Sequence, residues 1–209
     1  MTRAFMIGML AMALVVVASN ILVQFLLGDW LTWGAFTYPF AFLVTDLTNR
    51  TLGARAARRV VAGGFVIGVA CSLVASQLTG PEGYPLTTFR IAAGSGLAFL
   101  LAQLVDIGVF DRLRAGSWWR APFVSSLAGS ALDTLIFFSV AFSAALSFID
   151  PAEDVSWAAE RLPLLGAGPE VPLWVSLASA DFLVKMALAL VALIPFRLLM
   201  GLIAARRAA

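Results

Sequence analysis

The chain has 209 residues, of which 61% are hydrophobic and 12% are charged, and its formal net charge is +2. A soluble domain is usually about 45–50% apolar and roughly 25% charged, so this composition excludes an ordinary soluble domain and favours an integral membrane protein. Histidine is absent and Cys71 is the one cysteine, which removes the commonest general base and excludes an internal disulfide.

Six apolar segments follow one another along the chain, each long enough to supply the roughly 20 residues that a helix needs to cross a bilayer. We expect these spans at residues 5–27, 33–52, 60–78, 89–110, 121–148 and 173–204. They predict an all-α membrane protein in which residues 1–209 form a single domain, a six-transmembrane-helix bundle. The first segment is longer than the apolar part of a typical signal peptide, so we interpret it as a retained span.

Arginine marks every second connection between these spans, starting from the N-terminus. The residues concerned are Arg3, Arg55, Arg58, Arg59, Arg112, Arg114, Arg120, Arg206 and Arg207. Because positive residues favour the inner side of a membrane, we expect both termini to be cytoplasmic. The other connections carry acidic residues, among them Glu82 and five in the longest loop, at about 149–172, where residues 155–162 predict a short surface helix.

Tryptophans gather near the expected ends of spans, where an interfacial aromatic belt explains them; they are Trp30, Trp33, Trp118, Trp119 and Trp174. The apolar spans are expected to lie in a lipid bilayer. The basic residues are scattered rather than clustered, so no nucleic-acid partner is expected. The sequence contains no HExxH, GxSxG or P-loop pattern. We therefore expect no catalytic residues, no metal site and no cofactor.

Charged residues inside spans are the most informative feature, because each costs about 2.5–3.5 kcal/mol near the bilayer centre. Three polar pairs stand four residues apart and so share a helix face: Asp46 with Arg50, Asp181 with Lys185, and Asn20 with Gln24. Each charged pair is either a neutral ion pair that helps its helix to insert or part of a solute path. Asp133 has no basic residue at helical spacing on its own span, so it needs a partner from elsewhere, stays protonated, or meets water or a solute.

The second span is half hydrophilic, which is typical of a helix that lines a polar cavity. Pro39 frees a backbone carbonyl there and predicts an interruption, a frequent feature of transporter binding sites. Asp106 is expected to pair with Arg112 or Arg114 near the inner surface, and Arg90 to extend toward water at the outer surface.

The third span contains Gly64 and Gly68, a GxxxG pattern. This spacing permits close helix contact, which predicts either a homodimer or close packing within one chain.

Several segments in order along nearly the whole chain resemble the queuosine precursor transporter family. The most specific are Thr32-Trp33-Gly34-Ala35-Phe36-Thr37-Tyr38-Pro39-Phe40 and Thr45-Asp46-Leu47-Thr48-Asn49-Arg50, joined by Gln103-Leu104-Val105-Asp106, Trp118-Trp119-Arg120-Ala121-Pro122, Asp133-Thr134, and Asp181 with Lys185. The resemblance implies an importer in the bacterial inner membrane for 7-cyano-7-deazaguanine or 7-aminomethyl-7-deazaguanine, bases salvaged into the tRNA nucleoside queuosine.

A guanine-like edge presents two adjacent N–H donors and a carbonyl, which suit a carboxylate and an amide or cation respectively. We expect Asp133 or Asp46 to hold the N–H edge and Trp33 or Phe36 to stack on the ring. The remaining candidate substrate-binding residues, which would orient the base, are Asn20, Gln24, Arg50, Gln103 and Lys185. Two other functions stay open: the membrane subunit of an ATPase-dependent vitamin importer, and a membrane scaffold that transports nothing. The energy source stays open between facilitated and proton-linked uptake.

Overall fold

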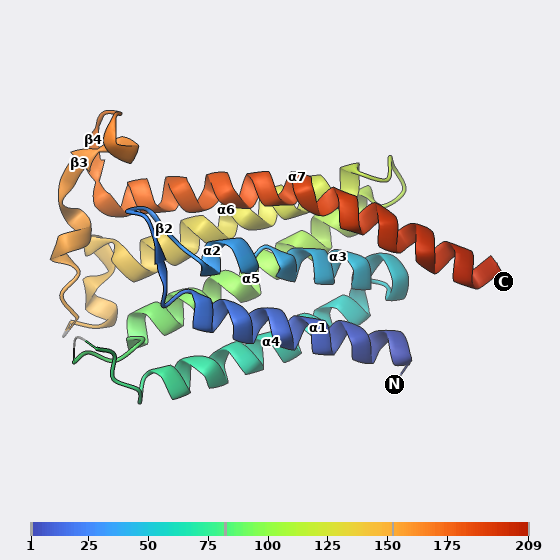
Figure 1. Cartoon of the computed structure of the whole chain (residues 1–209), viewed down its shortest axis with the longest axis horizontal. Coiled ribbons are helices and arrows are strands. Elements are labelled where there is room, and N and C mark those ends of the chain that lie inside the picture. The colour runs from blue at the N-terminus through green and yellow to red at the C-terminus, as the bar shows by residue number, and fades with distance from the viewer. Residues whose placement is uncertain (1, 82, 152, 209) are drawn as a thin grey trace.

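Five long helices form most of the bundle in a computed structural model of the chain, which describes residues 2–81, 83–151 and 153–208 (Figure 1). They are α1 (Arg3–Leu22), α4 (Ala54–Ala75), α5 (Phe89–Leu113), α6 (Arg120–Phe142) and α7 (Leu173–Ala208). Each is long and apolar enough to cross a membrane. The expected all-α membrane architecture is therefore confirmed. Glu82, one of the acidic residues noted in the connections, lies outside the described residues.

The second predicted span is not a continuous helix. It consists of α2 (Gly34–Thr37) and α3 (Phe40–Leu52), with a turn at Tyr38 and Pro39 between them. Proline cannot donate a backbone hydrogen bond, so the interruption expected at this position is confirmed. The prediction of one helix over residues 33–52 is wrong, because the segment is divided into two short pieces.

The first predicted span also ends earlier than expected. After α1 the chain forms a hairpin of β1 (Leu26–Leu27) and β2 (Leu31–Thr32), in which Leu27 pairs with Leu31. Gly28 turns the chain there with a φ of 65°, a conformation that glycine adopts at little cost. Residues 23–27 therefore leave the helix, which removes Gln24 from the face that carries Asn20.

The long acidic loop folds as a small irregular unit after α6. Three 3₁₀ helices, η1 (Ala144–Ile149), η2 (Ser156–Ala159) and η3 (Leu164–Gly166), accompany an antiparallel pair of β3 (Arg161–Pro163) and β4 (Glu170–Pro172). The expected helix at 155–162 is thus limited to one short turn. Figure 1 shows both chain ends at the end of the bundle opposite β3 and β4.

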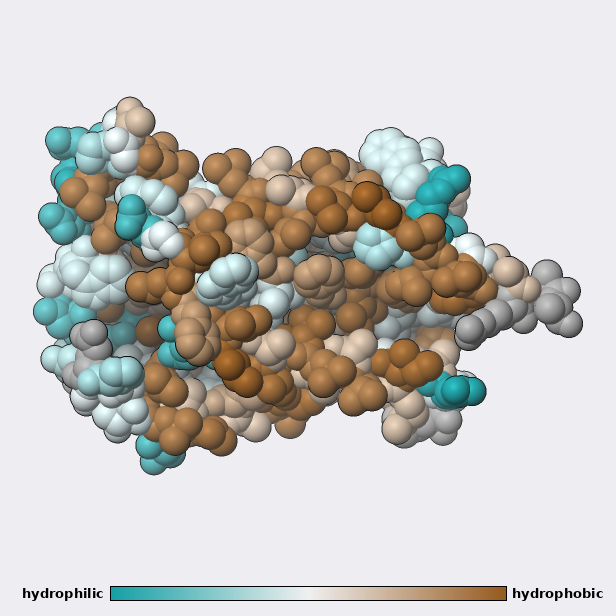
Figure 2. Space-filling view, in the orientation of Figure 1, coloured by the Kyte–Doolittle hydropathy of each residue, from teal (hydrophilic) through white to brown (hydrophobic). Residues whose placement is uncertain are grey.

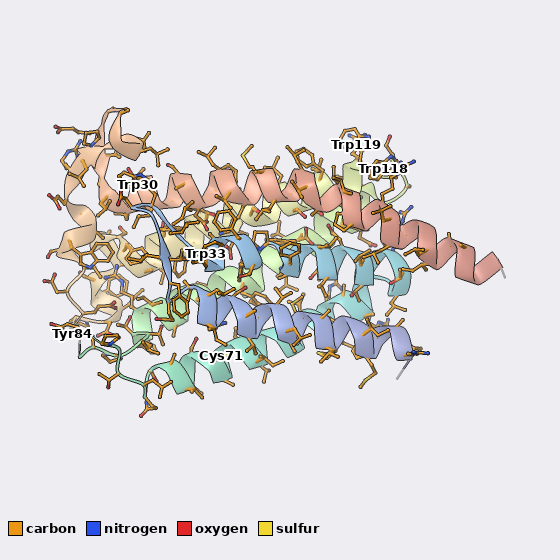
Figure 3. The ribbon with its side chains drawn as sticks, in the orientation of Figure 1. Trp30, Trp33, Cys71, Tyr84, Trp118 and Trp119 are labelled. Atoms are coloured by element: carbon orange, nitrogen blue, oxygen red, sulfur yellow. The ribbon has the colours of Figure 1, made fainter. Side chains whose placement is uncertain are left out.

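Apolar side chains cover the middle of the face in Figure 2, and hydrophilic residues gather at the two ends. Leu14, Val66 and Leu183 are more than half exposed, as suits helices that face lipid. Figure 3 places Trp30 toward the end with the β-strands and Trp118 and Trp119 at the other, as an interfacial belt predicts. These features describe a multi-pass membrane protein.

Helix α3 lies at the centre of the bundle and packs against α1, α4, α5, α6 and α7. The third-span glycines serve this internal packing. A Cβ on Gly64 would lie 2.7 Å from Met12 Cγ, and one on Gly68 would lie 3.6 Å from Val16 Cγ1. Close packing of α4 on α1 therefore accounts for the GxxxG pattern, and a homodimer stays a prediction without support from it.

Arg90 corrects another expectation, because it is fully buried instead of extending toward water. Its Nε donates to the Val140 carbonyl at 2.6 Å, and its Nη2 donates to the Ser143 carbonyl. These carbonyls belong to the last turn of α6, where a helix has no internal donors left. The guanidinium also complements the negative end of the helix dipole, so Arg90 joins α5 to α6.

Replacing Arg90 with methionine tests this role. We expect Arg90→Met to lower the free energy of unfolding by about 1–3 kcal/mol, because two buried carbonyls lose their donor. The measurement is thermal unfolding of the purified protein in detergent, with Arg55→Met as the control because Arg55 is exposed on α4. Equal unfolding temperatures for the two variants would show that the Arg90 bonds contribute nothing.

Candidate solute-binding site

An ion-pair network centred on Lys185 of α7 lies inside the bundle. The Lys185 Nζ atom lies 2.6 Å from Asp133 Oδ2 on α6 and 2.5 Å from Asp181 Oδ2, one turn earlier on α7. Lys185 and Asp133 are each 4% exposed. The Asp181–Lys185 pair expected from its spacing is thus formed, and Asp133 finds its partner on another helix.

Two neutral side chains complete this network, which we call the Lys185 network: Lys185, Asp133, Asp181, Thr134 and Tyr38. Thr134 donates to Asp181 at 2.7 Å and accepts from Lys185 at 3.2 Å. Tyr38, at the break between α2 and α3, donates its hydroxyl to Asp133 Oδ1 at 3.1 Å. The Lys185 ammonium also lies 5.6 Å from the centroid of the Tyr38 ring.

The network contains two carboxylates and one ammonium, so it carries an excess negative charge when all three groups are ionised. Ion pairs in an apolar interior are stable only with good geometry and further hydrogen bonds, which Thr134 and Tyr38 supply here. Each bonded oxygen of Asp133 still has a free lone pair. The arrangement can therefore accept N–H donors from a solute.

A second buried polar group lies where α3, α5 and α6 meet. Asp46 accepts hydrogen bonds from Ser125 at 3.2 Å and from Ser126 at 3.3 Å. Thr45 donates to Gln103 Oε1 at 2.6 Å, and Asn49 donates to the Ile107 carbonyl at 3.3 Å. These contacts place Asp46 and Gln103 in one polar layer, separate from the Lys185 network.

Asp46 and Arg50 do not form the ion pair that their spacing predicts. Arg50 Nη1 instead donates to the Arg114 carbonyl at 2.5 Å, while Asp46 turns to the hydroxyls of α6. Asp106 likewise does not pair with Arg112 or Arg114. It is fully buried, and Arg114 bonds to Asp111 at 2.9 Å.

The other candidate residues make no hydrogen bond to the Lys185 network among the described residues. Asn20 donates to the Val16 carbonyl of its own helix at 2.9 Å, and Gln24 is exposed beyond the end of α1. Trp33 is 48% exposed, and its ring centroid lies 6.1 Å from that of half-buried Phe36. The structure therefore brings Asp133 and Lys185 together and leaves Gln24 and Trp33 outside.

Two narrow cavities lie on the two sides of the Tyr38–Pro39 break. One is lined by Pro39, Asp46, Ser126 and Lys185, and therefore touches both polar groups. The other lies between α1, α4 and α5 and is lined by Asn20 and Tyr38. They have room for only about one or two water molecules. A purine-sized solute would need movement of the helices around the break.

Sequence reasoning did not single out Tyr38, Thr134, Ser125 or Ser126 as site residues. Tyr38 directly precedes Pro39 at the predicted interruption, and a hydroxyl-bearing aromatic at a helix break is a usable signal. The adjacent serines could have been noted as two donors in an otherwise apolar span. Among the described residues, no group of three His, Cys, Asp or Glu side chains could hold a metal ion.

The chain is similar to known membrane transporters. It is 42% identical over 142 residues to the "Queuosine precursor transporter" of Escherichia coli (strain K12), which covers 62% of this chain and 64% of that protein. It is also 42% identical over 124 residues to the "Probable queuosine precursor transporter" of Haemophilus influenzae (strain ATCC 51907 / DSM 11121 / KW20 / Rd), which covers 53% of this chain and 52% of that one.

The matched segments therefore span less than two thirds of either relative. No solved structure matches the chain. Residues 32–200 match the family model described as "Putative vitamin uptake transporter", and this range contains the Lys185 network and the polar layer around Asp46. The chain therefore belongs to this vitamin uptake transporter family, whose members are transporters and not enzymes.

Proposed function

We propose that this protein imports queuosine precursors, 7-cyano-7-deazaguanine or 7-aminomethyl-7-deazaguanine, across the bacterial inner membrane for use in tRNA. The observation that carries the proposal is the buried Lys185 network beside the broken α2–α3 segment. Its excess carboxylate is complementary to the two N–H donors of a guanine-like edge. The names of the two similar transporters support the same class of solute.

In this proposal Asp133 accepts the N–H edge of the base after its bond with Tyr38 opens. Lys185 remains paired with Asp181 and is placed to donate to the carbonyl of the base. The Tyr38 ring is nearer to this network than the exposed Trp33, and it can stack on the base once released. Gln103 and Arg50 have a supporting role in α3 packing through their bonds.

We propose six crossings, with α2 and α3 together forming the second, and with both termini in the cytoplasm. A labelling experiment tests this orientation in a Cys71→Ala background, which removes the native thiol. Ala167→Cys, in the loop after α6, and Ser117→Cys, between α5 and α6, each place an exposed thiol at one end.

In intact spheroplasts a membrane-impermeant maleimide should label Ala167→Cys and should label Ser117→Cys only after permeabilisation. Labelling of Ser117→Cys in intact cells, with Ala167→Cys protected, would reverse the proposed orientation.

Uptake in cells tests the function itself. A bacterial strain that can neither synthesise nor import the precursors should regain queuosine in its tRNA when supplied with 7-cyano-7-deazaguanine and this protein. Asp133→Asn should reduce initial uptake about tenfold or more, because a hydrogen bond to a charged group contributes about 1.5–3 kcal/mol. Lys185 keeps Asp181 in this variant, so the fold should persist.

Asp111→Asn is the matched control, because Asp111 is an exposed aspartate on α5 whose one ion pair among the described residues is with Arg114. It should take up precursor like the unchanged protein. Wild-type uptake by Asp133→Asn would remove Asp133 from the binding site. Absence of any uptake, with the protein present in the membrane, would contradict the importer proposal and favour dependence on an ATPase partner.

A further inference from the structure

Asp46 on α3 and Asp106 on α5 form a buried acidic pair distinct from the Lys185 network. Asp46 is 2% exposed and Asp106 is fully buried. Thr45 bonds Gln103 and Asn49 bonds the Ile107 carbonyl, so α3 and α5 touch at this level and bring the two carboxyl groups close together. We call these two residues the inner acidic pair. Asp106 takes no part in the ion pairs of Lys185 or in the contacts proposed to bind the base.

Several buried acceptor atoms around the inner acidic pair receive no hydrogen bond. Ser125 and Ser126 give their hydrogens to Asp46. Neither oxygen of Asp106 has a partner in the part of the chain that the structure describes, and the same holds for the buried Oδ1 of Asn49, three residues from Asp46. A buried acceptor without a donor is costly. The Nε2 of Gln103, three residues before Asp106, is a buried donor that also lacks a partner, but its two hydrogens cannot satisfy three acceptor atoms. The group therefore still lacks a hydrogen.

Positive side chains on the surrounding helices are all used elsewhere or exposed. Lys185 of α7 lines a cavity with Asp46, but it bonds Asp133 and Asp181. Arg50 of α3 bonds the Arg114 carbonyl. Buried Arg90 of α5 bonds the Val140 and Ser143 carbonyls. The other side chains of this kind that the structure describes are exposed or pair with other groups; they are Arg3 of α1, Arg55, Arg58 and Arg59 of α4, Arg112 of α5, Arg114 after it, Arg120 of α6 and Arg197 of α7.

The inner acidic pair therefore has no ion-pair partner among the described residues. Two adjacent carboxylates in an apolar interior cannot both be ionised, since their repulsion adds to the cost of burying each charge. One bound proton removes a charge, and its O–H supplies the donor that the pair lacks. Such a pair titrates as a unit.

We propose that the inner acidic pair binds one exchangeable proton and couples its movement to that of the solute. The proton enters from the outer side, resides on one carboxyl and leaves to the cytoplasm. The coupling rests on the proposed function and on the position of α3, which begins directly after the Tyr38–Pro39 break and carries Asp46. Opening the Tyr38–Asp133 bond to admit a base would shift α3 and separate Asp46 from Asp106.

The test uses the purified full chain in liposomes with labelled 7-cyano-7-deazaguanine. Solute exchange at equal pH needs no net proton movement, whereas accumulation under an imposed pH gradient does. The unchanged protein should accumulate solute when the outside is acidic. Asp106→Asn should retain exchange and lose accumulation, falling to the level reached without a gradient. Asp111→Asn, on the same helix but exposed, should behave like the unchanged protein.

Infrared spectroscopy of the same protein gives a readout that requires no transport. A protonated carboxyl has a C=O band distinct from that of a carboxylate. This band should be present at neutral pH, shift in heavy water, and change in position or intensity in Asp106→Asn, which removes one of the two carboxyls. The band should remain unchanged in Asp111→Asn. Failure of all solute movement with the band present would contradict the importer proposal alone.

Absence of the band in the unchanged protein would overturn the proton site, even if Asp106→Asn fails to fold. Accumulation that follows a sodium gradient, or that persists in Asp106→Asn, would overturn the coupling.

Discussion

The Lys185 ion pairs are the constraint on which the rest of the bundle depends. Three charged groups lie inside a protein whose outer surface is apolar, and each would be costly there without its partners. Satisfying them fixes α6 against α7 and draws Tyr38 inward to donate to Asp133. Because Tyr38 directly follows α2, the same bond holds the break between α2 and α3 against α6, and α3 lies at the centre of the bundle.

Apolar packing and buried polar groups are concentrated on different helices. Helices α1 and α4 contribute apolar packing, with glycines that allow close contact, whereas α3, α6 and α7 carry polar residues that a lipid-facing surface would not tolerate. A broken helix is stable in a membrane only when protein surrounds it, and five helices surround α3. The cavities beside the break are too small for a purine-sized solute, and in the proposed function the break is where the helices would move to admit one.

Much of this organisation could be predicted from the sequence. A helix that faces lipid must be apolar, so the hydropathy pattern predicts the spans, and Pro39 predicts the interruption of the second one. Helical spacing also predicted Asp181 with Lys185. The same spacing gave a wrong prediction of an ion pair between Asp46 and Arg50. Asp46 instead accepts from serines of α6, and Arg50 donates to a carbonyl after α5, and spacing within one helix does not reveal such partners. The bond between Lys185 and Asp133 and the close approach of Asp46 to Asp106 each join distant parts of the chain. Contacts of this kind depend on how helices rotate and pack, which no local pattern specifies.

The central claim is that a buried carboxylate binds the N–H edge of a deazaguanine. Calorimetric titration of the purified protein with 7-cyano-7-deazaguanine, and with the same base lacking its 2-amino group, tests it most directly. Loss of this donor should weaken binding about tenfold or more in the unchanged protein and should have little further effect in Asp133→Asn. Equal affinity of the unchanged protein for both bases would contradict it.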